Sequence, residues 1–229
     1  ATATAEAGHT KWGVDVSKRR VDQVNAGIST IEDIPSSVVA RLVSAGRLRA
    51  TADYSELKDV DVAVIAVPTP IDEYRVPDLS FVKAAAEALA RVMKRGSLVI
   101  LESTSYPGTT EEILVVALQV QGKIPGEDVF VGYSPERIDP GNKKWTIKNT
   151  PKIVSGLNQE SLELTQAWYG SFIDQRVPVP SLLPAQSAQV FENIFRMVYI
   201  ALVNETQIIS DSLVSGVWDA SPACPRRPF

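Results

Sequence analysis

Short, almost unbroken apolar runs alternate with stretches of helical periodicity along most of the 229-residue chain. The runs at 60–67, 97–102 and 128–133 are too short for most helices, and their continuity is typical of strands buried on both faces of a parallel sheet. Strands that alternate with helices at this spacing indicate a sheet with helices on both of its faces. We therefore predict an α/β fold built on a doubly wound parallel sheet.

The remaining elements follow from the same periodicities and from capping residues. Further strands are expected at 10–16, around Leu48, at 153–155 and at 176–179. Helices are expected at 1–7, 17–27, 36–46, 80–93, 107–118 and 159–172.

Residues 185–213 contain neither proline nor glycine and carry an apolar stripe, which predicts one long helix after the proline-rich stretch at 178–184. Its length indicates the start of a second, helical domain or a dimer spine. Residues 221–229 contain three prolines and show no periodicity, so we expect a disordered tail. The expected domains are therefore 1–180, 181–220 and 221–229.

Two hydroxyl-rich turns follow neighbouring strands of the predicted sheet. Pro68 and Pro70 end the strand at 60–67 and present Thr69 at its carboxyl edge. The strand at 97–102 leads into a second turn at 102–110, which is rich in serine and threonine. Because both turns lie at the edge where open α/β sheets bind ligands, they suggest a nucleotide cofactor.

Charge and composition narrow the range of partners. The net charge is -4, and the basic clusters are confined to 18–20 and 143–144, which argues against a nucleic-acid partner. No apolar run approaches the roughly 20 residues of a membrane span, and the start does not resemble a signal peptide, so we expect a cytoplasmic protein without a membrane partner. The single cysteine, Cys224, excludes an internal disulfide and a cysteine pair for zinc, and we expect no metal.

Several motifs together resemble those of the UDP-glucose/GDP-mannose dehydrogenase family, and most of all its UDP-N-acetylmannosamine and UDP-N-acetylglucosamine 6-dehydrogenases. They are Gly8-His9, Asp15 followed by Arg20, Val-Pro-Thr-Pro at 67–70, Glu-Ser-Thr-Ser-Tyr-Pro-Gly-Thr-Thr at 102–110, Tyr-Ser-Pro-Glu-Arg-Ile-Asp-Pro-Gly-Asn at 133–142, and Glu192-Asn193 before Ala-Leu-Val-Asn-Glu at 201–205. The resemblance covers about residues 1–219. It implies a Rossmann-like fold and the oxidation of a sugar C6 alcohol to a carboxylate by two NAD molecules in succession, with a cysteine thiolate and a lysine ammonium group.

The resemblance also implies the cofactor site. Asp15 would accept hydrogen bonds from the ribose hydroxyls of NAD, and Arg20 would lie near the adenosine phosphate. Thr69 and Thr104 match family positions that touch the cofactor. The alternatives are an ordinary aspartate at a strand end, an arginine on a solvated helix face, and threonines that serve only their turns.

The implied substrate is a UDP-sugar. Arg137 and Ile138 match the family segment that meets it, and Asn193 and Arg196 match positions on the long helix. Asn193 and Arg196 lie three residues apart and so share a helix face, while an arginine fork suits a diphosphate or carboxylate. The alternative is a solvated helical pair with a salt bridge to Glu192 or Glu136.

Two positions match catalytic residues of the family. Glu136 could position water for thioester hydrolysis, or it could be a structural carboxylate that caps nearby amides. Gln189 stands four residues before Asn193, where the resemblance places the catalytic lysine. Since glutamine carries no positive charge, stabilisation of the oxyanion is expected to fall by several kcal/mol.

The other departures from the family lie at the ends. The family's first strand and its Gly-x-Gly-x-x-Gly turn should precede Ala1, and its cysteine loop should follow the last residue, with Cys224 matching nothing in that loop. In a sheet of order 3-2-1-4-5-6 the first strand is central, so we expect its two neighbours to have unpaired edges.

Two hypotheses follow from these matches and departures. The first is a nucleotide-sugar 6-dehydrogenase represented by an incomplete chain. The second is an inactive relative that binds nucleotide weakly or serves as a dimerisation partner. In either case we expect a homodimer formed through the helix at 185–213.

Overall fold

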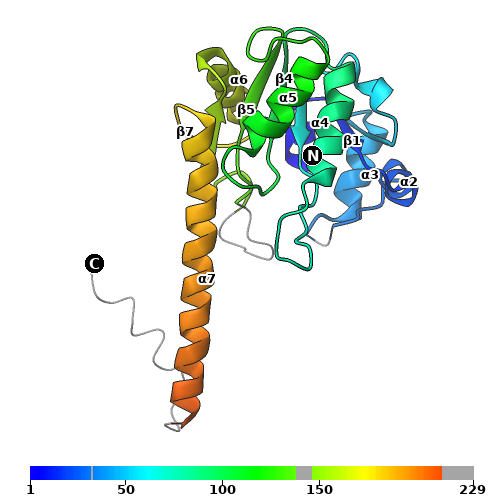
Figure 1. Cartoon of the computed structure of the whole chain (residues 1–229). Coiled ribbons are helices and arrows are strands. Elements are labelled where there is room, and N and C mark those ends of the chain that lie inside the picture. Colours follow the sequence, from blue (N-terminus) through cyan, green and yellow to red (C-terminus); the bar gives the residue numbers. More distant parts are fainter. Residues whose placement is uncertain (32, 138–145, 213–229) are drawn as a thin grey trace. The chain divides into compact units, whose positions relative to one another are not determined.

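The computed structural model describes residues 1–31, 33–137 and 146–212, and it confirms the α/β class (Figure 1). The chain divides into two compact units, Ala1–Ser187 and Ala188–Phe229, which are described separately. The predicted tail at 221–229 lies outside the described residues.

A small parallel sheet comes first in the chain. It pairs β1 (Lys11–Val14) with β2 (Leu48–Thr51) in a register that places Lys11 opposite Leu48. The helices α1 (Thr2–Glu6), α2 (Lys18–Asn25) and α3 (Ser36–Ser44) accompany it, as the sequence predicted. Ala5, Val39, Leu42 and Leu48 form its buried cluster.

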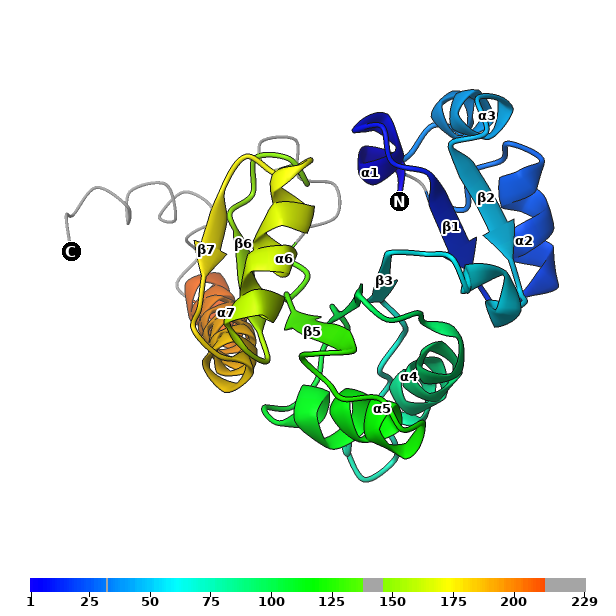
Figure 2. The ribbon, with the colours of Figure 1, turned by 90° about the horizontal axis from the view of Figure 1, so that it is seen from above.

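A five-stranded sheet carries the rest of the first unit, in the order β3-β4-β5-β6-β7. Its strands are β3 (Val62–Ile65), β4 (Ser97–Leu101), β5 (Val129–Tyr133), β6 (Lys152–Gly156) and β7 (Arg176–Pro178). Figure 1 labels β4, β5 and β7, and Figure 2 labels β3, β5, β6 and β7. Leu98, Ile100, Val154, Leu162, Tyr169 and Ile173 form its buried cluster.

Two strands depart from the expected parallel sheet, because β6 pairs antiparallel with β5 through Gly132–Gly156 and Tyr133–Ser155, and β7 runs parallel to β6. A parallel neighbour needs a crossover that returns the chain to the opposite edge, usually a helix. The antiparallel pairing means instead that β6 starts from the edge at which β5 ends. This reversal brings Lys152 to the carboxyl edge of β4 and β5.

The sheet is also divided. β1 is an edge strand of the small sheet and β3 is an edge strand of the large one, and β1 lies apart from the larger sheet in Figure 2. The family resemblance places a central strand between these two, and the described residues form no strand there. The expectation of two strands with open edges therefore agrees with the structure.

Four helical segments accompany the large sheet: α4 (Ser80–Val92), the π-helix η2 (Thr110–Val115), α5 (Val116–Val120) and α6 (Gln159–Gly170), with the 3-10 helix η1 (Tyr54–Leu57) before β3. The helix expected at 107–118 thus begins three residues later and opens with π geometry. Segments of π-helix are rare and often occur at functional sites.

The long helix α7 (Leu182–Ser212) has 31 residues and is unbroken, as predicted (Figure 1). It starts three residues before the predicted position, with Pro184 in its first turn, where a missing backbone donor costs no hydrogen bond. None of the helices in the described part of the chain is long and apolar enough to cross a membrane.

Candidate functional site

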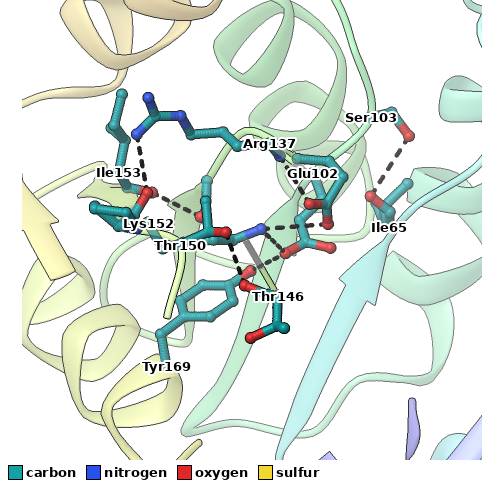
Figure 3. Close-up of polar contacts among 12 residues, drawn as sticks. Ile65, Glu102, Ser103, Arg137, Thr146, Thr150, Lys152, Ile153 and Tyr169 are labelled. Atoms are coloured by element: carbon teal, nitrogen blue, oxygen red, sulfur yellow. Dashed lines mark hydrogen bonds and ion pairs between the residues drawn. The ribbon is translucent and has the colours of Figure 1, made fainter. Parts of the chain in front are cut away.

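A cluster of charged side chains lies at the carboxyl edge of the large sheet (Figure 3). Glu102 follows β4, Glu136 follows β5 by three residues, and Lys152 opens the antiparallel strand β6. The Lys152 ammonium nitrogen lies 2.7 Å from Glu102 Oε1 and 3.5 Å from Glu136 Oε2. One buried cation therefore stands between two carboxylates from neighbouring turns.

Tyr169 of α6 completes this cluster. Its hydroxyl group donates a hydrogen bond of 2.5 Å to Glu102 Oε1, and the Lys152 ammonium group lies 5.2 Å from the centre of its ring. Burial, together with the negative charge of Glu102, raises the pKa of Tyr169 well above its usual value. The phenol therefore stays protonated and serves as a donor.

The charged groups of this cluster differ in how far they are buried, and burial of a charge costs free energy. The Lys152 side chain is 7% exposed and that of Glu102 is 15% exposed, whereas that of Glu136 is 45% exposed. Removing charges from water costs several kcal/mol unless each is paired. Lys11 of β1 also faces Glu102: burial lowers the pKa of Lys11, and the Glu102 charge opposes that shift.

The two hydroxyl-rich turns are joined by Ser103, which the sequence analysis did not single out. Its hydroxyl group accepts a hydrogen bond of 2.9 Å from the Val67 amide and donates one of 2.8 Å to the Val67 carbonyl. Thr69 and Thr104 therefore sit on turns that are fixed to each other, with Thr104 exposed and Thr69 partly exposed. Sequence reasoning predicted the shared edge but not this link, because a serine in a polar turn carries no separate signal.

Ser105 lies next to Thr104 and has a buried hydroxyl oxygen for which the described residues offer no hydrogen-bond partner. Buried polar atoms are nearly always paired with protein, water or ligand. A hydroxyl of this kind at the carboxyl edge fits a site that is built to receive a polar ligand.

Asp15 and Arg20, both predicted to bind the cofactor, lie together. Asp15 accepts a hydrogen bond of 2.8 Å from the Ser17 amide, and its other oxygen lies 3.3 Å from the Arg20 guanidinium group. Both side chains keep access to solvent, at 35% and 59% exposed. Asp15 follows the last residue of β1, a position that suits a contact with a ribose. The ion pair with Arg20 is equally consistent with the alternative, an aspartate that only makes local contacts at a strand end.

Arg137 is held at both ends. Its guanidinium group donates a hydrogen bond of 2.9 Å to the Pro151 carbonyl, and its backbone amide donates one of 2.7 Å to Glu136 Oε1. Ile138, the other predicted contact in this segment, lies outside the described residues. Arg137 and Glu136 are thus brought together beside Lys152.

The remaining predicted residues lie on α7, in the unit that begins at Ala188. Gln189, Asn193 and Arg196 are spaced four and three residues apart and so share one helix face. Asn193 and Arg196 are exposed. A salt bridge from Arg196 to a nearby glutamate is not among the ion pairs found in the described residues.

The first turn of α7 belongs to the first unit and is fixed to the turn at 106–110. Gln186 is fully buried, accepts a hydrogen bond of 2.5 Å from the Gly108 amide, and donates one of 2.6 Å to the Thr110 hydroxyl. This amide therefore joins the start of α7 to the start of η2. Sequence analysis missed it because a lone glutamine at a helix start has no motif.

The sequence of the domain that carries this site matches that of a known protein family. Residues 1–173 match the model of the UDP-glucose/GDP-mannose dehydrogenase family, NAD binding domain. The chain belongs to this family. NAD is accordingly the cofactor of the domain, as the sequence predicted.

Curated relatives of this chain include proteins named as nucleotide-sugar dehydrogenases. The chain is 38% identical over 199 residues to a UDP-N-acetyl-D-glucosamine 6-dehydrogenase from Pseudomonas aeruginosa, covering 86% of this chain and 46% of that protein. The solved structure of a UDP-D-ManNAc dehydrogenase from Pyrococcus horikoshii matches with a TM-score of 0.92 and 31% identity, covering 100% of this chain and 55% of that one. The chain thus spans about half the length of the relatives it matches.

The residues present fit NAD, since they provide a strand-end carboxylate, exposed hydroxyl groups on fixed turns and the buried Ser105 oxygen. Within residues 1–31, 33–137 and 146–212, no three histidine, cysteine, aspartate or glutamate side chains gather so as to hold a metal ion.

Proposed function

We propose that the protein is an NAD-dependent nucleotide-sugar 6-dehydrogenase that oxidises the C6 alcohol of a UDP-N-acetylhexosamine to the uronic acid. The observation that carries this proposal is the match of residues 1–173 to the family's NAD-binding domain, together with 38% identity to a UDP-N-acetyl-D-glucosamine 6-dehydrogenase. The cluster at the carboxyl edge supports it, because open α/β sheets bind their ligands there.

Each predicted residue of the first unit has a separate role in this proposal. Asp15 accepts hydrogen bonds from the ribose hydroxyls, and Arg20 lies close to the adenosine phosphate. Thr69 and Thr104 contact the cofactor from the two turns that Ser103 joins. When bound, NAD supplies the acceptor for hydride from the sugar carbon. Glu136, half exposed beside these turns, holds water for hydrolysis of an acyl intermediate.

The proposed substrate contacts are the residues that match the family's substrate-binding positions. Arg137, with Ile138 beside it in the sequence, meets the UDP-sugar from the first unit. Asn193 and Arg196 meet it from α7, where an exposed amide and a guanidinium fork suit sugar hydroxyls and a diphosphate.

One residue favours a second candidate function. Gln189 occupies the position of the family's lysine and cannot supply a positive charge to an oxyanion. On this reading the chain is an inactive relative that binds nucleotide weakly or serves as a dimerisation partner. The exposed apolar side chains of α7 favour the latter role.

Titration of the 229-residue polypeptide with NAD by calorimetry tests the proposed cofactor site. We expect weak binding, because Asp15, Thr69 and Thr104 are present while residues 1–229 contain no Gly-x-Gly-x-x-Gly sequence to cradle the pyrophosphate. Asp15→Ala should weaken it further, and Asp22→Ala, an exposed position on α2, serves as the matched control. Unchanged affinity in Asp15→Ala would remove the ribose assignment, and micromolar binding would show that another segment holds the pyrophosphate.

A further inference from the structure

We propose that Lys152 is a positioning residue for Glu136. Its buried ammonium group holds the Glu136 carboxylate at the carboxyl edge of the sheet, while Glu102 and Tyr169 fix the ammonium group itself. The proposal rests on the proposed function in one respect: it takes Glu136 as the carboxylate that serves the reaction.

The backbone around Lys152 leaves the side chain little freedom. β6 lies between β5 and β7, and Lys152 is paired with Arg176 in the parallel register of β7. The Lys152 amide donates a hydrogen bond of 3.0 Å to the Gln175 carbonyl. With its side chain 7% exposed, the ammonium group reaches the edge from a fixed starting point.

The two carboxylates are held unequally. Glu102 Oε1 receives both the lysine at 2.7 Å and the Tyr169 hydroxyl at 2.5 Å, and its side chain is 15% exposed. Glu136 Oε2 lies 3.5 Å from the lysine, and that side chain is 45% exposed. Glu102 is therefore the fixed anchor, and Glu136 keeps the access to solvent that a group facing a ligand requires.

A cation is needed between them because two like charges on adjacent turns repel each other. Glu136 Oε1 already accepts the Arg137 amide at 2.7 Å, so the lysine orients the second oxygen of the same carboxylate. The competing explanation is that Lys152 serves only as the counter-ion of buried Glu102.

The side-chain rotamer of Glu136 distinguishes these explanations without any need for turnover. Three-bond couplings in glutamate labelled with carbon-13 report whether a side chain holds one rotamer or averages over several. We expect Glu136 to hold one rotamer in the starting protein and in Lys152→Arg, and to average in Lys152→Met as exposed Glu127 does. Lys94→Met is the matched control, since Lys94 lies 2.7 Å from Asp61 in an exposed pair.

Two further variants decide the case in which Lys152→Met does not fold. Glu102→Gln removes the charge but keeps a side-chain oxygen that can accept a hydrogen bond from the Lys152 ammonium group, so we expect Glu136 to stay in one rotamer. The double variant Lys152→Met/Glu102→Gln leaves no uncompensated buried charge at these two positions, and there we expect Glu136 to average.

Single-rotamer couplings for Glu136 in a folded Lys152→Met or in the double variant would overturn the proposal and leave Lys152 as a counter-ion of Glu102. The NAD titration is read separately on the same proteins. If the Glu136 couplings are as expected but NAD does not bind, the result counts against the proposed function and not against the role of Lys152.

Discussion

Two tyrosines of this chain donate hydrogen bonds of the same length to glutamates, in opposite surroundings. Tyr169 lies 2.5 Å from Glu102 and is 2% exposed, while Tyr106 lies 2.5 Å from Glu112 and is 41% exposed. The pKa of both phenols is raised, that of Tyr169 chiefly by burial and that of Tyr106 chiefly by its glutamate partner. Since water competes only for the exposed pair, the two bonds should differ in their contribution to stability.

Tyr169→Phe should lower the free energy of unfolding by about 1.5–3 kcal/mol, because it removes a donor from a largely buried carboxylate. Tyr106→Phe should change it by less than about 0.5 kcal/mol, as surface substitutions usually do. Urea unfolding of the two variants measures both values. Equal losses would mean that burial does not set the strength of the Glu102 contact.

Residues within motifs were predicted from the sequence as site residues, whereas isolated residues were not. Asp15 and Arg20 were predicted together and form an ion pair in the structure. Lys152 and Tyr169 were not predicted, since a lysine at a strand start and a tyrosine within a helix are ordinary in any sequence. The antiparallel direction of β6 brings Lys152 to Glu102, and Tyr169 reaches the same carboxylate from α6.

At the scale of elements, two strand glycines set how closely α6 packs on the sheet. A Cβ atom on Gly156 would lie 2.2 Å from the Leu162 amide nitrogen, and one on Gly132 would lie 2.4 Å from the Thr165 hydroxyl. The sequence predicted the strands and this helix, because apolar periodicity marks both. It could not predict the direction of β6, because that periodicity is the same whichever way a strand runs.

Gly156→Ala should cost about 1–3 kcal/mol or more, because the methyl group would meet helix backbone rather than a movable side chain. Gly13→Ala on β1 is the matched control, since its nearest contact would be the Arg49 carbonyl at an ordinary 3.7 Å. Thermal unfolding compares the two variants. A Gly156→Ala protein as stable as Gly13→Ala would show that α6 can move away from the sheet at no cost.

At the scale of the whole molecule, α7 leaves much apolar surface uncovered in the described part of the chain. Its exposed large apolar side chains are Leu183, Phe191, Ile194, Phe195, Met197, Val198, Tyr199, Ile200, Leu202, Ile208 and Ile209. Patches of this kind mark interaction surfaces. The helix itself was predicted from its uninterrupted periodicity, but the sequence could not say which of its faces would remain uncovered.

The proposed homodimer through α7 therefore predicts that Phe195→Glu favours the monomer, because a charge would have to be buried against an apolar partner. Sedimentation equilibrium measures the mass, with Leu164→Glu, an exposed position on α6, as the matched control. A starting protein that is monomeric at all concentrations would remove the proposed homodimer.

Catalysis requires the cofactor site, a cationic oxyanion donor and a nucleophile together. We expect the 229-residue polypeptide alone not to reduce NAD with UDP-N-acetylglucosamine or UDP-N-acetylmannosamine. Gln189 lacks the charge of the family's lysine, and loss of one oxyanion donor typically lowers kcat by about 10²–10³. Residues 1–229 also lack a Gly-x-Gly-x-x-Gly sequence, and their one cysteine is Cys224. Since parts that act as a unit are not additive, Gln189→Lys alone should restore little. A steady rise in NADH absorbance with either sugar nucleotide, abolished by Asn193→Ala, would instead show that this polypeptide is a working dehydrogenase.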